Sequence, residues 1–193
     1  LVNIYGIDKD RLYITYFEGD EQLGIGPDLE TKELWAEYFD ESKIIKGDTQ
    51  DNFWMMGDTG PCGPCSELHI DLTPKGDSKG EMVNADSARC IEIWNLVFIQ
   101  YNANEGGGFE PLPVKHVDTG MGFERVAAII QSTNNFTDFS GVVSNYDTDI
   151  FGPIFTEIEK LSGKKYTATL PGKELLEQEK ELLVLAKKWM PRL

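Results

Sequence analysis

The sequence predicts an α+β fold in which an antiparallel β-sheet is flanked by helices. Strand-like segments follow one another through turns rather than through crossover helices, and this connectivity is typical of antiparallel sheets. Helical periodicity is confined to separate segments between or after the strands. Hydrophobic residues make up 40% of the 193 residues and aromatic residues 11%, which is enough to form a core in one domain, or one and a fraction.

The first third of the chain predicts a strand, a helix and a loop. β-forming residues fill 11–17, with Leu12, Ile14 and Tyr16 on one face. A helix is expected over 28–40, with Asp28 as its N-cap. Residues 44–45 form a short strand or link, and the glycines and prolines of 47–66 predict a loop. The apolar stripe expected on the helix consists of Leu29, Leu34, Trp35, Tyr38 and Phe39.

The middle of the chain predicts the remaining strands. Residues 67–72 alternate polar and apolar side chains, which indicates a strand with one buried face. Residues 73–90 are rich in turn formers, and 90–102 form the most hydrophobic run, predicted to be a long strand buried on both faces or nearly so. A glycine-rich hairpin turn at 103–108 and a strand at 110–115 follow.

Helices dominate the C-terminal part. From Phe123 the apolar residues fall at helical spacing, and after a polar insertion at 134–145 a second helix is expected over 150–161. A charged amphipathic helix is expected over 174–190. The inward residues expected in the first helix are Phe123, Val126, Ala127 and Ile130, and in the second Ile154, Phe155, Ile158 and Leu161.

Charge and cysteine content restrict the classes of function. The net charge of −15 excludes a general basic surface for nucleic acid, so any such contact must be local or made by other parts. No apolar stretch is long enough for a transmembrane helix, and no membrane partner is expected. Three cysteines fit a reducing, cytoplasmic compartment better than a disulfide scaffold. The N-terminus lacks an initiator Met, and we expect the chain to be cut from something longer.

The segment 117–125 is the most informative one. Gly120 and Gly122 provide a floor without side chains, between a predicted strand and a predicted helix, so that a ligand can approach the backbone. Asp118 precedes this floor and could hold an amine, whereas Arg125 follows it and could hold a phosphate by a bidentate fork. An amino acid being joined to a nucleotide carries both charges.

Two further motifs carry polar chemistry. Cys62 and Cys65 have the C-x-x-C spacing of a dithiol site or half a zinc site, but we favour a rigid loop that lies close to a ligand or strand, with Trp54 and Glu67 as its contacts. In the long strand, Glu92 and Asn95 differ in parity, so we expect one on each face and at least one at a cavity or a metal. The two histidines, His69 and His116, are assigned no role.

These segments together resemble the C-terminal part of the catalytic core of the alanyl-tRNA synthetases, a family of class II aminoacyl-tRNA synthetases. The carrying segments are 52–67, 92–102, 117–125 and 145–149, and the likeness covers roughly residues 1–170, taken as a partial catalytic domain. Residues 171–193 are an unassigned C-terminal amphipathic helix.

The resemblance implies site residues and substrates. Arg125 would be the catalytic arginine on the γ-phosphate of ATP, with Glu92 and Gly122 at ATP or Mg²⁺. Alanine would be held by Trp54, Asn95, Val97, Asp118 and Gly120. The implied cofactors are ATP and Mg²⁺, the partners are alanine and tRNA(Ala), and no zinc site is expected outside an editing domain that this chain lacks. The family's first two signature motifs are also absent, so the chain is expected to be a fragment that is inactive alone.

Overall fold

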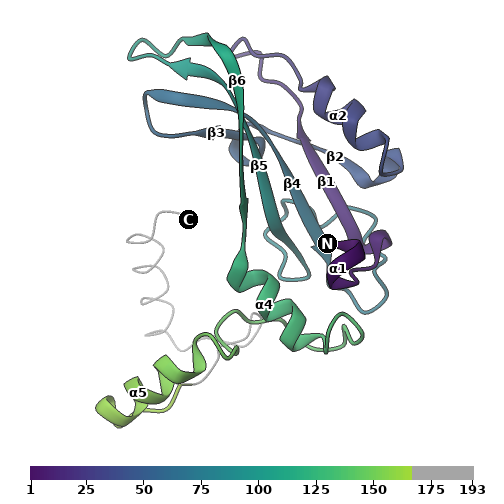
Figure 1. Ribbon diagram of the computed structural model, residues 1–193, viewed down its shortest axis with the longest axis vertical. Helices are drawn as coiled ribbons and strands as arrows, with labels where there is room; N and C mark the ends of the chain where they lie inside the picture. The colour runs from purple at the N-terminus through teal and green to yellow at the C-terminus, as the bar shows by residue number, and fades with distance from the viewer. Residues whose placement is uncertain (167–193) are drawn as a thin grey trace. The chain divides into compact units, whose positions relative to one another are not determined.

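The computed structural model describes residues 1–166 of the chain (Figure 1). The chain divides into two compact units, Leu1–Thr148 and Asp149–Leu193. The predicted helix over 174–190 and the predicted boundary at residue 170 lie outside the described residues. The sheet and every predicted site residue belong to the first unit.

A six-stranded sheet forms the first unit, in the order β2-β1-β4-β5-β6, with β3 also paired to β4. All neighbouring strands are antiparallel except β1 and β2, which are parallel. The α+β class with a mostly antiparallel sheet is therefore confirmed. The strands are β1 Leu12–Phe17, β2 Ile44–Gly47, β3 Phe53–Met55, β4 Gly60–Asp71, β5 Cys90–Ala103 and β6 Phe109–Met121.

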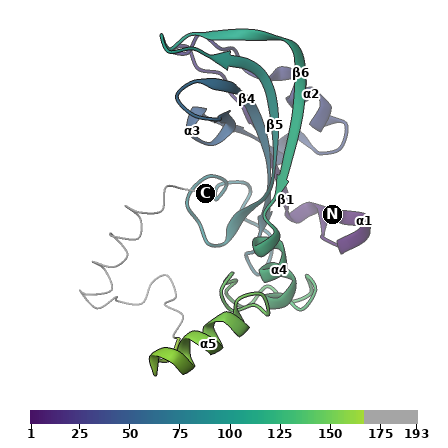
Figure 2. The same cartoon turned by 60° about the vertical axis from the view of Figure 1, so that its left-hand side comes forward.

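Helices and short helical turns surround this sheet. In the turned view of Figure 2, α1 and α2 lie on one side of the sheet and α3 on the other. The helical elements are α1 Val2–Tyr5, η1 Lys9–Arg11, α2 Leu29–Ala36, η2 Glu41–Lys43, α3 Thr49–Asn52, α4 Phe123–Ser132 and, in the second unit, α5 Gly152–Ser162.

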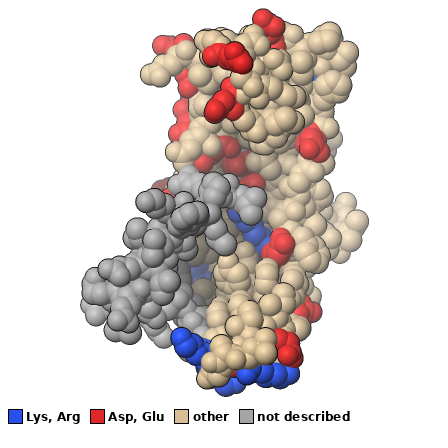
Figure 3. Space-filling model, turned by 90° about the vertical axis from the view of Figure 1, so that its left-hand side faces the viewer, with Lys and Arg blue, Asp and Glu red and all other residues tan. Residues whose placement is uncertain are grey.

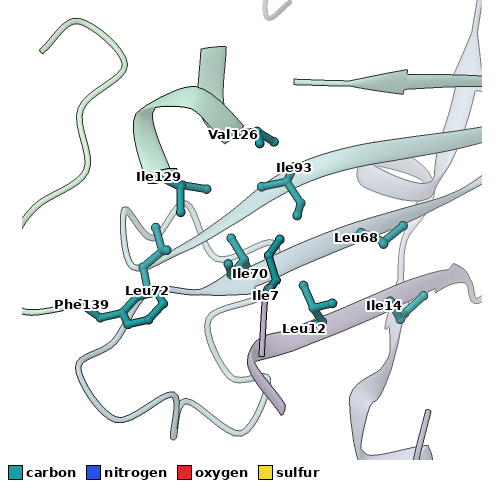
Figure 4. Packing of buried hydrophobic residues seen from close by; sticks show 10 residues of the cluster. All are labelled: Ile7, Leu12, Ile14, Leu68, Ile70, Leu72, Ile93, Val126, Ile129 and Phe139. Carbon is teal, nitrogen blue, oxygen red and sulfur yellow. The ribbon is translucent and has the colours of Figure 1, made fainter. Parts of the chain in front are cut away.

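The main core lies where α4 packs on the sheet (Figure 4), at the end of the sheet that is lower in Figure 1. Val126 and Ile129 of α4 pack on Ile93 of β5 and on apolar residues of β1 and β4. The expected stripe of α4 is only partly right, because Phe123 is 61% exposed while Ala128 and Ile129 are buried. The buried residues of this core are Ile7, Leu12, Ile14, Leu68, Ile70, Leu72, Ile93, Val126, Ile129 and Phe139.

Helix α2 is shorter than predicted, and fewer of its predicted apolar residues pack against the core. Asp28 caps it as expected, accepting a hydrogen bond from the Thr31 amide at 3.1 Å. Trp35 packs against the main core and donates to Ser66 Oγ at 2.8 Å, and Phe39 beyond the helix packs there too. The rest of the predicted stripe is wrong, because the remaining three residues are exposed: Leu29 at 53%, Leu34 at 56% and Tyr38 at 62%.

The predicted loop over 47–66 is wrong, because most of it is regular structure. It contains α3, β3 and the first half of β4. Gly63 has no side chain, which allows β4 to lie close to β5. The regular pairing of β4 with β5 is interrupted between Cys62 and Cys65. Pro64 lies in this irregularity, where its lack of a backbone N–H costs no hydrogen bond to β5. Pairing with strands on both edges of β4 thus overrides the local turn signals.

The burial of the two central strands is the reverse of the expectation. Strand β4 is buried on both faces over 62–71, rather than on one. Most of β5 is only half-buried, although it was expected to be covered on both faces. In the second unit, Ile154, Ile158 and Leu161 of α5 are exposed rather than inward, whereas Phe155 stacks on Tyr166 with ring centroids 4.2 Å apart.

Candidate active site

Four of the predicted site residues lie together on one face of the sheet. Asn95 of β5 stands opposite Gly120 of β6, and Val97 stands opposite Asp118. Directly opposed residues of an antiparallel pair share a face, and so do residues two apart in a strand. Asn95, Val97, Asp118 and Gly120 therefore form one patch, which we call the quartet.

The face that bears the quartet continues across β4 and β1 as a polar surface. Asn95 is also opposite Glu67, and Glu67 lies against Thr15 of β1, whose hydroxyl accepts from the Glu67 amide at 2.9 Å. We call this side of the sheet the polar face. Helix α2 covers the opposite face, where its Trp35 reaches Ser66.

The quartet is only partly open to solvent, since Asn95 and Val97 are half-buried and the Oδ1 atom of Asn95 is buried. Asp118 and Gly120 are exposed, and a Cβ added at Gly120 would meet nothing within 4 Å. Asp118 accepts a hydrogen bond from the Thr119 amide at 2.8 Å, which fixes one carboxylate oxygen. Within residues 1–166, no lysine or arginine forms a salt bridge with this carboxylate. Such an arrangement can receive a positively charged amine above a floor without side chains.

Glu92 and Asn95 lie on the same face, which corrects the expectation from their parity. The β4–β5 register shifts between Leu68 and His69, so that Trp94 is opposite Leu68 but Glu92 is opposite His69. This bulge inserts one extra residue in β5 and brings Glu92 to the face of Asn95. Glu92 and Asn95 therefore both lie on the polar face.

Arg125, in the first turn of α4, is anchored to Glu92. Its Nη1 donates to the Glu92 carboxylate at 2.8 Å and to the Glu92 carbonyl oxygen at 2.9 Å. The two side chains are 35% and 30% exposed, so the pair is half-buried but accessible. The predicted phosphate ligand and the predicted metal ligand are thus neighbours whose charges compensate each other in this structure.

Gly122 sets the entry of α4. It is the N-cap residue, and its amide donates to the Ile93 carbonyl at 2.9 Å. A Cβ at this position would stand 3.1 Å from Cδ of Arg125. The absence of a side chain at Gly122 therefore leaves room for the Arg125 side chain beside Glu92.

Trp54 lies farther along the sheet than the quartet. It is half-buried in β3 and paired with Gly63 of β4, and β4 separates it from β5. Among the described residues, it makes no hydrogen bond to any member of the quartet. Its predicted place in an alanine pocket stays a prediction.

A buried network centred on Glu67 escaped the sequence analysis. Glu67 is 6% exposed and His69 is 3% exposed, and His69 Nε2 lies 3.1 Å from Glu67 Oε2. Asn84 of the loop after β4 donates to the same oxygen at 3.2 Å, and Asn95 donates to Oε1 at 3.3 Å. The available signal was the run of polar residues at odd-numbered positions of β4, but their burial depends on contacts such as that of Asn84, which the local sequence does not show.

The two cysteines of the C-x-x-C motif are buried in strand β4 and do not lie in the predicted loop. Burial, helped by the negative charge of Glu67, raises the pKa of the Cys65 thiol to about 12, and burial also raises the pKa of Cys62. A thiol in this state is a poor nucleophile. The described residues contain no cluster of three or more potential metal ligands.

Acidic side chains spread over the upper part of the face drawn in Figure 3, with few basic ones among them.

Two hollows, of about 240 and 260 Å³, are lined by residues near the two ends of α2 and contain none of the predicted site residues. Within residues 1–166 no helix is long and apolar enough to cross a membrane.

Comparison with known proteins finds a matching family and several relatives. The family model described as tRNA synthetases class II (A) matches residues 1–187. The chain is 53% identical over 179 residues to an alanine–tRNA ligase of Akkermansia muciniphila, a match that covers 89% of this chain and 19% of that protein. It is 49% identical over 172 residues to the alanine–tRNA ligase of Schizosaccharomyces pombe, covering 88% and 17%.

A third relative is the cytoplasmic alanine–tRNA ligase of Dictyostelium discoideum, which is 50% identical over 163 residues, covering 84% of this chain and 16% of that protein. The chain thus spans less than a fifth of the length of these curated relatives. The family model, in contrast, covers nearly the whole chain. The chain therefore belongs to the family of class II (A) tRNA synthetases.

Proposed function

We propose that the complete protein containing this chain is an alanine–tRNA ligase, and that this chain supplies part of its catalytic core. The protein would activate alanine with ATP and pass it to tRNA(Ala). The observation that carries the proposal is the quartet beside the Glu92–Arg125 pair, in a chain about half identical to alanine–tRNA ligases.

Alanine binds at the quartet. Asp118 receives the α-ammonium group, and Asn95 accepts from the same group. Val97 and Gly120 line the space for the methyl group, with Trp54 as a wall. A small pocket of this kind discriminates modestly, since one methylene is worth only about 1–3 kcal/mol. Glycine and serine would therefore be activated to some extent.

ATP binds at the Arg125 end. Glu92 and Arg125 already face each other at 2.8 Å, and both are accessible. Mg²⁺ is usually held by one or two carboxylates together with substrate phosphate oxygens, and the accessible Glu92 carboxylate fits that share of the ligands. When bound, Mg²⁺ would offset the charge that develops on the phosphates. Arg125 would turn from Glu92 to the γ-phosphate, with Gly122 leaving space for that movement.

The chain's residues act by positioning and by charge, not as nucleophiles. The carboxylate of alanine attacks the α-phosphorus of ATP and expels pyrophosphate, so no protein group needs to form a covalent bond. Asp118 holds the amine so that the carboxylate points along the sheet toward the nucleotide, and Arg125 stabilises charge on the leaving phosphates. The chain alone is expected to lack activity, because much of such a site would come from other parts.

The three thiols fit a reducing, cytoplasmic compartment, because each of Cys62, Cys65 and Cys90 is free and buried. An oxidoreductase based on Cys62 and Cys65 is disfavoured by the same burial. Contact with tRNA would be local or made by other parts, because the chain's net charge is −15.

Amino-acid-dependent exchange of pyrophosphate into ATP tests the proposal directly. With the complete protein, alanine should support exchange, glycine and serine should support weaker exchange, and large amino acids should support none. If alanine binds but no amino acid supports exchange, the protein is a sensor of amino acids and not a ligase. If another amino acid is preferred, the assignment of the quartet to alanine is wrong.

A further inference from the structure

The amide of Asn95 has one end satisfied and the other without a partner. Its Nδ2 donates to Glu67 Oε1 at 3.3 Å. Its Oδ1 is buried and has no hydrogen-bond partner among the described residues. A buried acceptor without a donor costs free energy in the empty protein and indicates a place where a ligand supplies the donor.

Glu67 decides which end of that amide is free. A carboxylate accepts hydrogen bonds but does not donate them, so the NH₂ group of Asn95 has to face it. The oxygen of Asn95 then faces away from Glu67. On the polar face, the residues next to Asn95 on that side are the other members of the quartet.

Glu67 is itself held by donors on its second oxygen. Oε2 lies 3.1 Å from His69 Nε2 and accepts from Asn84 at 3.2 Å. The Thr15 hydroxyl accepts from Asn52 and from the Glu67 amide, so its one proton is left for Oε2, at 3.4 Å. Three donors therefore surround one oxygen, and the other oxygen is left for Asn95.

We propose that Glu67 is a positioning residue that orients the Asn95 amide, so that Asn95 Oδ1 accepts a hydrogen bond from the α-ammonium group of the amino acid. His69 holds Glu67 in this role. The inference rests on the proposed function, because it takes the quartet to be the amino-acid site. It adds a residue outside the quartet that decides whether the site presents an acceptor or a donor.

The substitution Glu67→Gln tests this orientation. The three donors around Oε2 would take the new amide oxygen, which leaves the NH₂ group of the new side chain facing Asn95. The Asn95 amide must then rotate by half a turn, and its NH₂ group would meet the ammonium group of the substrate. Since a hydrogen bond to a charged group contributes about 1.5–3 kcal/mol, the alanine KM is expected to rise roughly 10- to 100-fold.

The experiment is pyrophosphate exchange with the complete protein, measured at varied alanine and at varied ATP. The ATP KM should change little in Glu67→Gln, whereas a merely structural defect would lower kcat or affect both substrates. Glu81→Gln is the matched control, because Glu81 is an exposed carboxylate in the loop after β4. It should leave both KM values unchanged.

Rescue by a second substitution makes the test stricter. In Glu67→Gln/Asn95→Asp the new carboxylate can accept from Gln at one oxygen and present the other to the ammonium group. The alanine KM should return close to that of the unmodified protein, and this measurement stands by itself if Glu67→Gln alone does not fold.

An alanine KM that stays unchanged in Glu67→Gln, or a double variant no better than Asn95→Ala, would overturn the inference. Failure of the unmodified protein to exchange with alanine would instead overturn the proposed function.

Discussion

Replacing Gly63 by Ala is expected to destabilise the chain strongly, because an added Cβ at Gly63 would clash with the backbone of β5. An added Cβ would stand 2.0 Å from the Phe98 carbonyl oxygen and 3.0 Å from the Gln100 nitrogen. Both are backbone atoms of β5, so the contact can be relieved only by shifting the pairing of the two central strands. Overpacking typically costs about 1–3 kcal/mol and occasionally more, and a contact with backbone places this variant at about 3 kcal/mol.

Urea unfolding of this chain, followed by tryptophan fluorescence, measures the effect. With an m value of about 2 kcal/mol per molar urea, a loss of 3 kcal/mol lowers the unfolding midpoint by about 1.5 M. Gly57→Ala is the control, because Gly57 is exposed and its added Cβ would meet only Thr59 O at 3.9 Å. Equal midpoints for Gly63→Ala and Gly57→Ala would refute the argument that close strand approach requires glycine here.

Two further predictions concern titratable groups. Burial raises the pKa of Cys65 and of Cys90 to about 12 each, with help from the charges of Glu67 and Asp71 respectively. As pH rises, the thiols ionise in the unfolded chain before they ionise in the folded chain, so the free energy of unfolding should fall above about pH 8.5. The thiols should react with Ellman's reagent only when the chain unfolds. Rapid reaction of the native chain would contradict this. Burial raises the pKa of Asp71, but hydrogen bonds from Ser78 and Thr73 outweigh it and hold the pKa below its ordinary value. Asp71 therefore stabilises the fold above about pH 4, and this contribution is lost as pH falls through its lowered pKa. Asp71→Asn should show a smaller loss of stability in acid than the unmodified chain, and an equal loss would be evidence against this role.

Periodicity predicted the elements whose local pattern agrees with their final environment. The long run at 90–102 and the helix from Phe123 are present as β5 and α4, within one or two residues of the expected limits. The turn at 103–108 joins β5 to β6, as the glycines indicated. In these segments, side-chain spacing and turn residues carry the structural information themselves.

The errors arose where long-range pairing decides the outcome. The segment with Cys62 and Cys65 has the composition of a loop, yet it is a strand because β3 and β5 pair with its two edges. The prediction that Glu92 and Asn95 lie on opposite faces was wrong because the bulge between them cannot be recognised in the sequence. The burial of Glu67 depends on residues distant in the sequence, such as Thr15 and Asn95, so its network was missed although Glu67 itself was noted.

The charges of the candidate site could be read from the sequence, but their coupling could not. The segment 117–125 indicated one carboxylate before a glycine floor and one arginine after it. Arg125 lies in the first turn of α4, but the strand predicted over 110–115 continues to Met121 as β6, so Asp118 and Gly120 lie within the strand and not after its end. The contact of Arg125 with Glu92 joins residues 33 positions apart, and only the fold brings them together.

The substitution Asp118→Asn in the complete protein tests the central claim most directly, which is that the amine of alanine lies at Asp118 and the phosphates of ATP lie at Arg125. Loss of a hydrogen bond between charged groups should raise the alanine KM roughly 10- to 100-fold or more, while the ATP KM changes little. If Asp118→Asn binds alanine normally but loses affinity for ATP, the two ends of the site are assigned the wrong way round.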